Sequence, residues 1–195
     1  MGGLVAIELE THKLIANMAP QDYISVILPT RQRIEPCIKS VMTMVETAQH
    51  PGKVEFVLVW DDDDRQTAEA TMEKLSPKLK DAGVNRFSAH TIPRRGYERL
   101  NEYVTWGAKQ SVGQWIIFWN DDAVMNTFNW DTEIRKWDGK FRILRMKEQT
   151  KHPYSIFPVV PRDWMTVLGH LSYHPSSDAH ISQIAYMLDI MENID

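Results

Sequence analysis

Two adjacent carboxylates, Asp121 and Asp122, directly follow residues 115–119 and Asn120, where an unbroken run of bulky apolar residues ends. Neighbouring carboxylates repel each other unless a cation, a proton or a hydrogen-bonding ligand neutralises them. Mg²⁺ and similar hard cations are usually held by one or two carboxylates together with substrate phosphates. The pair therefore predicts a site for a divalent metal and a phosphate. A helix N-cap or a solvated turn is the structural alternative, because aspartate is common at both.

A second acidic group, residues 61–64, consists of four consecutive aspartates at the end of another apolar run, residues 54–60. An EF-hand calcium loop is excluded, because it requires glycine at its sixth position and glutamate at its twelfth, where Gln66 and Met72 stand. One of the four, Asp63 or Asp64, could cap a following helix. The remaining acids at this strand end are expected to face a ligand.

The elements that must position these acids alternate along the chain. Apolar and β-branched runs predict strands, and apolar residues at helical spacing predict helices between them. The predicted strands are residues 23–28, 54–60, 86–92 and 115–119, and the predicted helices are residues 35–49, 65–79 and 97–111. This alternation favours an α/β fold with a parallel sheet covered by helices on both faces.

Ligands of open α/β sheets bind beyond the carboxyl ends of the strands. Both acidic groups stand at such ends, as does the polar loop of residues 29–33. Residues 93–96 (Pro-Arg-Arg-Gly) form a cationic turn after the third strand, suited either to an anion or simply to solvent. The sequence therefore predicts polar, ligand-capable loops at the carboxyl ends of these strands.

Fewer signals mark the rest of the chain. Residues 4–9 could be a short strand or helix within an N-terminal extension. The later predicted elements are helices over residues 128–137, 161–168 and 179–191 and strands over residues 141–146 and 155–160. Pro158 is expected at a sheet edge or bulge, because proline cannot donate to a strand ladder.

Composition narrows the class of protein. The chain has 195 residues, 43% hydrophobic and 25% charged, which is typical of one globular domain. A net charge of −4 argues against nucleic acid as a partner. The single cysteine, Cys37, is expected to be a buried structural thiol. Because no apolar run is long enough for a membrane span and no signal peptide is recognisable, a cytoplasmic protein is predicted.

Several of these motifs resemble, in the same order, those of family-2 glycosyltransferases. Residues 24–30 with Arg33 resemble the opening strand and loop of that family, and residues 57–62 resemble its second strand and nucleotide-reading aspartate. Asn101, Ala108 and residues 113–118 are similar to the segment leading to its metal-binding acids.

Asn120-Asp121-Asp122 falls where the family carries an Asp-any-Asp motif, so the first acid of the motif is an amide here. Gly169 and residues 174–178 resemble the acceptor-side segment that contains the catalytic acid. The resemblance extends over residues 23–191, which is nearly the whole chain.

What the resemblance implies is a Rossmann-like GT-A fold: a mostly parallel central sheet flanked by helices, with a small acceptor-side subregion. Residues 1–22 would be an N-terminal extension to a single domain, residues 23–195. Residues 23–125 would form its nucleotide-sugar half and residues 126–195 its acceptor half.

The resemblance also implies roles for individual residues. The residues it places at the nucleotide are Pro29, Thr30, Arg33, Asp61, Arg94, Arg95 and Asp121. Asp61 would hydrogen-bond the base, while Asp122, with Asp121 beside it, would hold Mn²⁺ or Mg²⁺ on the diphosphate. Asp178 would be the catalytic base, although on position alone it is expected to cap the last helix.

The function predicted from the sequence is metal-dependent transfer of a sugar, of the hexosyltransferase type. The donor would be a nucleotide-diphosphate sugar and the acceptor a carbohydrate or other hydroxyl compound, with inversion through Asp178. A nucleotidyltransferase is one alternative, but residues 29–33 lack the glycines usual in its phosphate loop. A nucleotide- or carbohydrate-binding module without turnover is the other, because Asn120 and the short C-terminus are consistent with lost activity.

Overall fold

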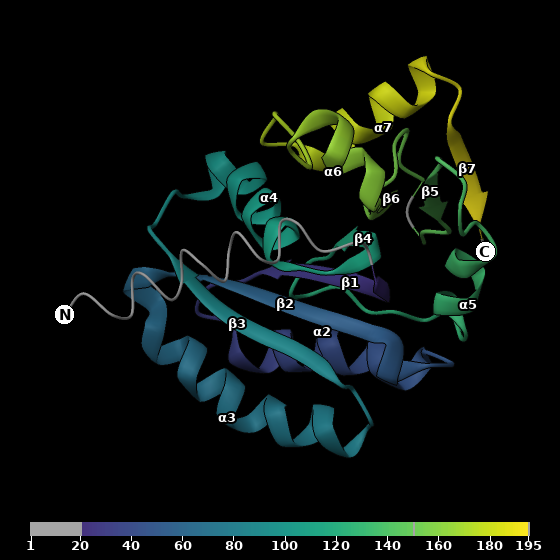
Figure 1. The fold of residues 1–195 in the computed structure, drawn as a ribbon. Helices are drawn as coiled ribbons and strands as arrows, with labels where there is room; N and C mark the ends of the chain where they lie inside the picture. Colours follow the sequence, from purple (N-terminus) through teal and green to yellow (C-terminus); the bar gives the residue numbers. More distant parts are fainter. Residues whose placement is uncertain (1–20, 150, 195) are drawn as a thin grey trace.

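The computed structural model describes residues 21–149 and 151–194, and the prediction for residues 4–9 lies outside this range. The strands, named as in Figure 1, are β1 (Gln21–Pro29), β2 (Val54–Asp61), β3 (Arg86–Ile92), β4 (Gly113–Phe118), β5 (Ile143–Met146), β6 (Pro158–Pro161) and β7 (Met191–Ile194). The α-helices are α2 (Ile34–Thr47), α3 (Arg65–Asp81), α4 (Leu100–Gln110), α5 (Trp130–Arg135), α6 (Arg162–Leu168) and α7 (Ser177–Met187). Short 3₁₀ turns are η1 (Pro51–Lys53), η2 (Asp62–Asp64) and η3 (Tyr97–Arg99).

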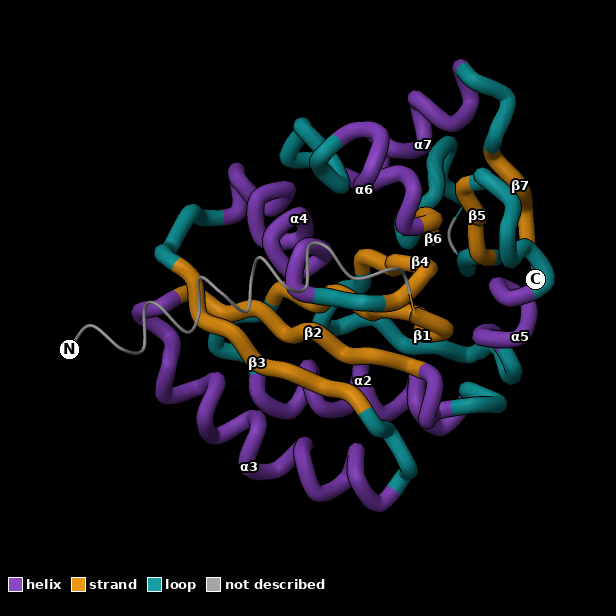
Figure 2. Tube along the Cα trace, viewed as in Figure 1, coloured by secondary structure: helices purple, strands orange, loops and turns teal. Residues whose placement is uncertain are grey.

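All seven strands form one sheet in the order β3-β2-β1-β4-β6-β5-β7 (Figure 2). β1 pairs in parallel with β2 and β4, and β2 pairs in parallel with β3. β6 is antiparallel to both β4 and β5, while β7 is parallel to β5. The predicted α/β fold with a mostly parallel sheet is confirmed.

Helices cover the two faces of this sheet because alternate strand residues point to opposite sides. Ile24, Val26 and Leu28 of β1 join a core cluster that includes residues of α2 and α3. Ile27 joins a second cluster with residues of α4, α6 and α7. In Figure 1, α2 and α3 lie on one face, and α4 and α6 lie on the other.

Helix α4 approaches the sheet closely through a glycine. A Cβ atom at Gly107 would lie 2.5 Å from Cγ2 of Ile27 and 3.3 Å from Cγ2 of Val59. Any larger residue would therefore push α4 away from β1 and β2. This contact matters for the site, since α4 carries Tyr103.

Arg162, the first residue of α6, ties the C-terminal part of the chain to the parallel half of the sheet. Its guanidinium donates hydrogen bonds to Gly113 O (2.8 Å), Ala108 O (2.7 Å) and Ser111 Oγ (2.7 Å). Burial lowers the pKa of this side chain to about 10, partly offset by the charge of Glu55.

Three predictions about the C-terminal part are wrong. Pro158 lies neither at an edge nor at a bulge but at the first position of the interior strand β6, where it is paired with Arg145 of β5. Proline is tolerated there because a strand's first residue can lack a ladder donor. The last helix, α7, ends at Met187 and a further strand, β7, follows it. The helix predicted for residues 128–137 is shortened to Trp130–Arg135, because Asn129 has a φ of 60°.

Candidate functional site

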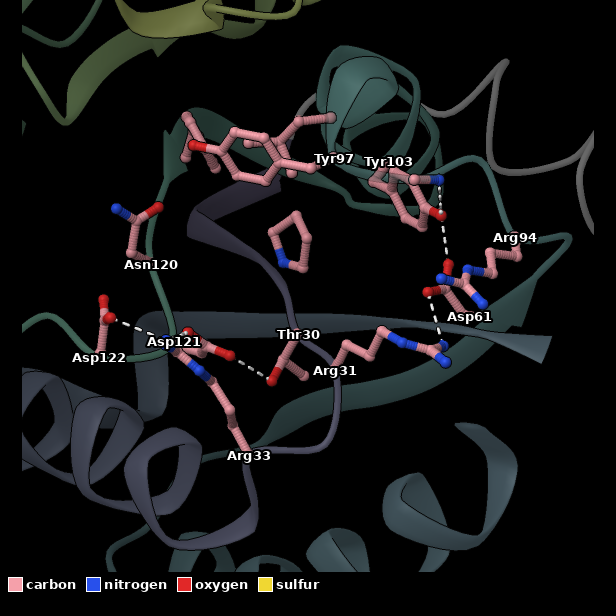
Figure 3. Close-up of a pocket in the computed structure, with 14 residues that line it drawn as sticks. Thr30, Arg31, Arg33, Asp61, Arg94, Tyr97, Tyr103, Asn120, Asp121 and Asp122 are labelled. Carbon is pink, nitrogen blue, oxygen red and sulfur yellow. Dashed lines mark hydrogen bonds and ion pairs between the residues drawn. The ribbon is translucent and has the colours of Figure 1, made fainter. Parts of the chain in front are cut away.

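A cavity of about 560 Å³ lies beyond the carboxyl ends of β1, β2 and β4 (Figure 3). The chain runs outward from β1 through β2 to β3 and then returns to the other side of β1 as β4. This reversal is the kind of topological switch point at which α/β proteins bind ligands. The cavity is lined by Pro29, Thr30, Arg31, Arg33, Asp61, Arg94, Gly96, Tyr97, Leu100, Tyr103, Phe118, Asn120, Asp121 and Asp122.

The acid pair lies at one end of the cavity and is bound by Arg33. Nη1 of Arg33 donates to Oδ1 of Asp121 (3.0 Å) and to Oδ2 of Asp122 (2.7 Å). Thr30 Oγ1 donates to the second oxygen of Asp121 at 2.6 Å. The bond to Asp122, and then that to Asp121, raises the pKa of Arg33. The repulsion within the pair is thus offset by one guanidinium.

The pair stands in a turn, and the next helix along the chain, α5, begins only at Trp130. A helix N-cap role for Asp121 or Asp122 is therefore wrong. Asp121 is buried, with 8% of its surface exposed, and the Asp122 side chain is 58% exposed. Asp121 is thus fixed by its neighbours, and Asp122 is the acid that presents itself to the cavity.

Asp61 lies at the other end, where both of its oxygens are engaged. Arg31 Nη1 donates to Oδ2 at 2.8 Å, and the Tyr103 hydroxyl donates to Oδ1. The same hydroxyl accepts hydrogen bonds from the backbone N–H groups of Arg95 (2.6 Å) and Gly96 (3.3 Å). Burial, and then the bond to Asp61, raises the pKa of Tyr103. Tyr103 therefore connects the carboxylate to the cationic turn.

The other aspartates of the 61–64 run hold loops together. Asp64 has the N-cap position of α3, but its carboxylate accepts from the backbone N–H of Gln32 (2.7 Å) and makes no side-chain cap. Asp63 pairs with Arg31 and with Arg94 (3.2 Å), and the bond from Arg31 lowers the pKa of Asp63. Asp62 accepts from the backbone N–H of Arg94 at 3.2 Å.

The structure brings together seven of the predicted site residues. Those lining the cavity are Pro29, Thr30, Arg33, Asp61, Arg94, Asp121 and Asp122. Arg95 is not among them, because its side chain pairs with Glu102 (3.3 Å). Asp178 lies in the first turn of α7 and accepts a hydrogen bond from Ala179 N (2.8 Å). The N-cap of α7 is Ser176, so the capping prediction for Asp178 is wrong.

Arg31, Tyr97 and Tyr103 are among the cavity residues to which sequence reasoning gave no role. Arg31 falls within the predicted polar loop but carries no signal of its own. Tyr103 occupies an ordinary core position of an amphipathic helix. Tyr97, 86% exposed at the cavity rim, has no sequence signal either.

A second cavity of about 510 Å³ adjoins the first and shares Asn120 and Asp122 with it. One wall continues from the turn through residues 123–127, and the other comes from residues 146–149, 156 and 157. The rings of Trp119 and Phe157, which both line the second cavity, pack at 4.2 Å between centroids. The second cavity is thus built largely by the predicted acceptor half.

The carboxylates of Asp121 and Asp122 fit a metal whose remaining ligands come from a substrate. Within residues 21–149 and 151–194, no three His, Cys, Asp or Glu side chains gather as a metal cage. Two carboxylates at a cavity wall are nevertheless the usual protein contribution to a Mg²⁺ site that phosphates complete.

Within residues 21–149 and 151–194, no helix is both long and apolar enough to cross a membrane.

No protein-family model matches the sequence, and no curated protein matches it. Solved structures of glycosyltransferases do match. A fragment of S. aureus TarS in complex with UDP-GlcNAc has a TM-score of 0.65 at 13% identity, over 88% of this chain and 56% of that one. Mannosyltransferase PcManGT from Pyrobaculum calidifontis, in complex with GDP-Man and Mn²⁺, has a TM-score of 0.64 at 14% identity. The match covers 98% of this chain and 66% of that one.

GlyE of Streptococcus pneumoniae TIGR4 has a TM-score of 0.58 at 8% identity, over 90% of this chain and 46% of that one. The chain therefore has a GT-A-like glycosyltransferase fold, as the sequence motifs imply. It spans from 46% to 66% of the length of these three neighbours.

Proposed function

We propose that the chain is a glycosyltransferase that moves a sugar from a nucleotide-diphosphate donor to an acceptor hydroxyl with the help of a divalent metal. The observation that carries this proposal is one cavity with Asp61 at one end, Asp121 and Asp122 at the other, and arginines paired with acids at both ends. Its volume of about 560 Å³ lies within the range of about 300–1,000 Å³ that is usual for ligand sites. Such an arrangement suits a ligand with a base at one end and a diphosphate at the other.

At the base end, Asp61 and Arg94 are the proposed contacts. Arg31 and Tyr103 hold the Asp61 carboxylate in one orientation, and an ordered carboxylate can accept a further hydrogen bond from a base N–H. Pro29, at the end of β1, would pack against the ring. That solved neighbours were crystallised with UDP-GlcNAc and GDP-Man supports a nucleotide-sugar donor.

At the diphosphate end, Asp122 with Asp121 would hold Mn²⁺ or Mg²⁺, which as a Lewis acid would stabilise the charge on the departing diphosphate. Arg33 would donate to phosphate oxygens, since a guanidinium binds phosphate in a fork geometry. Thr30 keeps Asp121 in place by its 2.6 Å hydrogen bond. The neighbour solved with Mn²⁺ supports the choice of metal.

The acceptor side is proposed for residues 126–195, because they supply much of the second cavity. This cavity shares Asp122 with the first. Asp178 is the proposed general base, which would take the proton of the attacking hydroxyl and give inversion. Asp178 lines neither cavity. Its role therefore requires that the hydroxyl that attacks the anomeric carbon also lies within hydrogen-bond reach of Asp178 on α7.

Two alternative functions would be distinguished from sugar transfer by their products. A nucleotidyltransferase would release pyrophosphate from a nucleoside triphosphate, and a binding module would bind a nucleotide sugar without turnover. The absence of glycine from residues 29–33 disfavours the first. The fold shared with glycosyltransferases favours neither alternative over sugar transfer.

The test is a thermal-shift screen of UDP, GDP and their sugars with Mn²⁺ or with EDTA. A ligand present at about 100 times its Kd should add about 2.7 kcal/mol to the unfolding free energy. Asp122→Ala should lose the Mn²⁺-dependent shift, and Asp81→Ala, a control at the exposed end of α3, should keep it. A screen in which no nucleotide sugar stabilises the protein would refute the function. Stabilisation without sugar transfer would identify a binding module, and pyrophosphate release a nucleotidyltransferase.

A further inference from the structure

We propose that Arg33 occupies the metal-binding face of the Asp121–Asp122 pair until a nucleoside diphosphate binds, so that the metal binds only together with the nucleotide. This inference rests on the proposed function, since it assumes that the pair holds a metal. It assigns to Arg33 a part beyond contact with phosphate, namely control of the order in which metal and donor bind.

The first support is how completely the pair is engaged. Of its four carboxylate oxygens, three already accept hydrogen bonds: Asp121 Oδ2 from Thr30, and Asp121 Oδ1 and Asp122 Oδ2 from Arg33. A single nitrogen, Nη1 of Arg33, bridges the two acids at 3.0 and 2.7 Å (Figure 3). The guanidinium thus lies where a cation bridging the two carboxylates would lie.

The second support is electrostatic. The two carboxylates carry a charge of −2, and the guanidinium reduces it to −1. A divalent ion approaching the pair therefore meets weaker attraction, together with repulsion from a positive charge within a few ångström. Binding of the metal alone would also leave Arg33 without its two partners. Both effects lower the affinity of the pair for the metal alone.

The third support is that Arg33 can leave the acid pair, whereas Thr30 cannot. The Arg33 side chain is half exposed and lines the cavity. Thr30 and Asp121 are each 8% exposed, so their hydrogen bond is fixed in the wall. Incoming phosphate oxygens would offer Arg33 a bidentate partner and the metal its missing ligands at once. The nucleotide therefore supplies what releases the guanidinium.

Arg31 provides a matched control within the same cavity. It also carries one positive charge and also bridges two acids, but these are Asp61 and Asp63 at the far end. Arg31→Gln and Arg33→Gln each remove one positive charge from the cavity. Only Arg33→Gln removes the cation from the Asp121–Asp122 pair, so a general effect of charge and a local effect of occupancy are separable.

The experiment is a titration of the full chain with Mn²⁺ alone, in which electron paramagnetic resonance measures the concentration of free Mn²⁺. Arg33→Gln should bind Mn²⁺ at least about tenfold more tightly than the unmodified chain, a typical allosteric coupling. Arg31→Gln should bind it as the unmodified chain does. The double variant Arg33→Gln/Asp122→Asn should lose the gain. Arg33→Met, which keeps an unbranched, uncharged stem in place of the guanidinium, serves as a second variant should the first fold poorly.

A second titration includes UDP or GDP. The nucleotide should raise the Mn²⁺ affinity of the unmodified chain strongly and that of Arg33→Gln much less, because the guanidinium no longer has to be released. Equal affinities for Mn²⁺ alone in the unmodified chain and both Arg33 variants would overturn the inference, as would an equal gain in Arg31→Gln. Tighter Mn²⁺ binding by Arg33→Gln without any response to nucleotides would instead contradict the proposed function and the coupling to nucleotide, while upholding the occupancy by Arg33.

Discussion

Replacing Tyr103 by phenylalanine tests how the Asp61 end of the cavity is held. The substitution keeps the buried ring, which is 6% exposed, and removes one oxygen. That oxygen donates to Asp61 and accepts from the backbone N–H groups of Arg95 and Gly96. The variant thus leaves Asp61 with Arg31 as its remaining partner and removes two hydrogen bonds from the turn after β3, where Arg94 still contacts Asp62 and Asp63.

The expected cost follows from these contacts. A hydrogen bond to a charged group contributes about 1.5–3 kcal/mol. The two backbone donors add little, because they lie in a turn that water can reach. We therefore expect the unfolding free energy to fall by about 2 kcal/mol, which for a domain of this size lowers Tm by about 4–8 °C.

Urea and thermal unfolding followed by circular dichroism measure this cost. Tyr97→Phe is the matched control, because it removes a hydroxyl at the rim of the same cavity from a residue that is 86% exposed. Its change should stay below about 0.5 kcal/mol. If Tyr103→Phe is as stable as the control, the hydroxyl does not hold the turn. A loss of stability with unchanged nucleotide affinity would refute its role in orienting Asp61.

Two further predictions concern single side chains. Asp178→Asn should lower turnover by about 10²–10⁴-fold while donor affinity hardly changes, and near-normal transfer or a product that retains the anomeric configuration would exclude Asp178 as the base. Cys37 is fully buried, and burial raises the pKa of its thiol to about 12. The thiol should therefore stay protonated and unreactive toward a disulfide reagent at about pH 8 and react once the chain unfolds; rapid labelling of the native protein would contradict this.

The position of the cavity was predictable because it depends on local patterns. The buried strands β2 and β4 show as apolar runs, and the acids Asp61, Asp121 and Asp122 follow them directly along the chain. Parallel pairing then brings their carboxyl ends to one edge of the sheet. The burial of Cys37 was predicted for a similar reason, since it lies among the apolar positions of a helix.

The partners of these acids were not predictable, because they come from distant parts of the sequence. Tyr103 is 42 residues from Asp61, and Arg33 is 88 residues from Asp121. Nothing in an amphipathic helix shows which core residue will carry a hydroxyl to a carboxylate. The strand β7 was missed for the same reason, since its short sequence forms a strand only by pairing with β5.

The interior position of β6 has a consequence for how this chain folds during its synthesis. Until residues 158–161 leave the ribosome, β4 presents an unpaired edge that carries Trp115, Ile116 and Ile117, the residues that later face β6. An apolar strand edge of this kind recruits strands from other chains. A fragment ending at residue 125 would therefore be expected to aggregate, even though it contains every residue that lines the first cavity. Any chimaera that exchanges residues 126–195 has to bring its own strand for this edge.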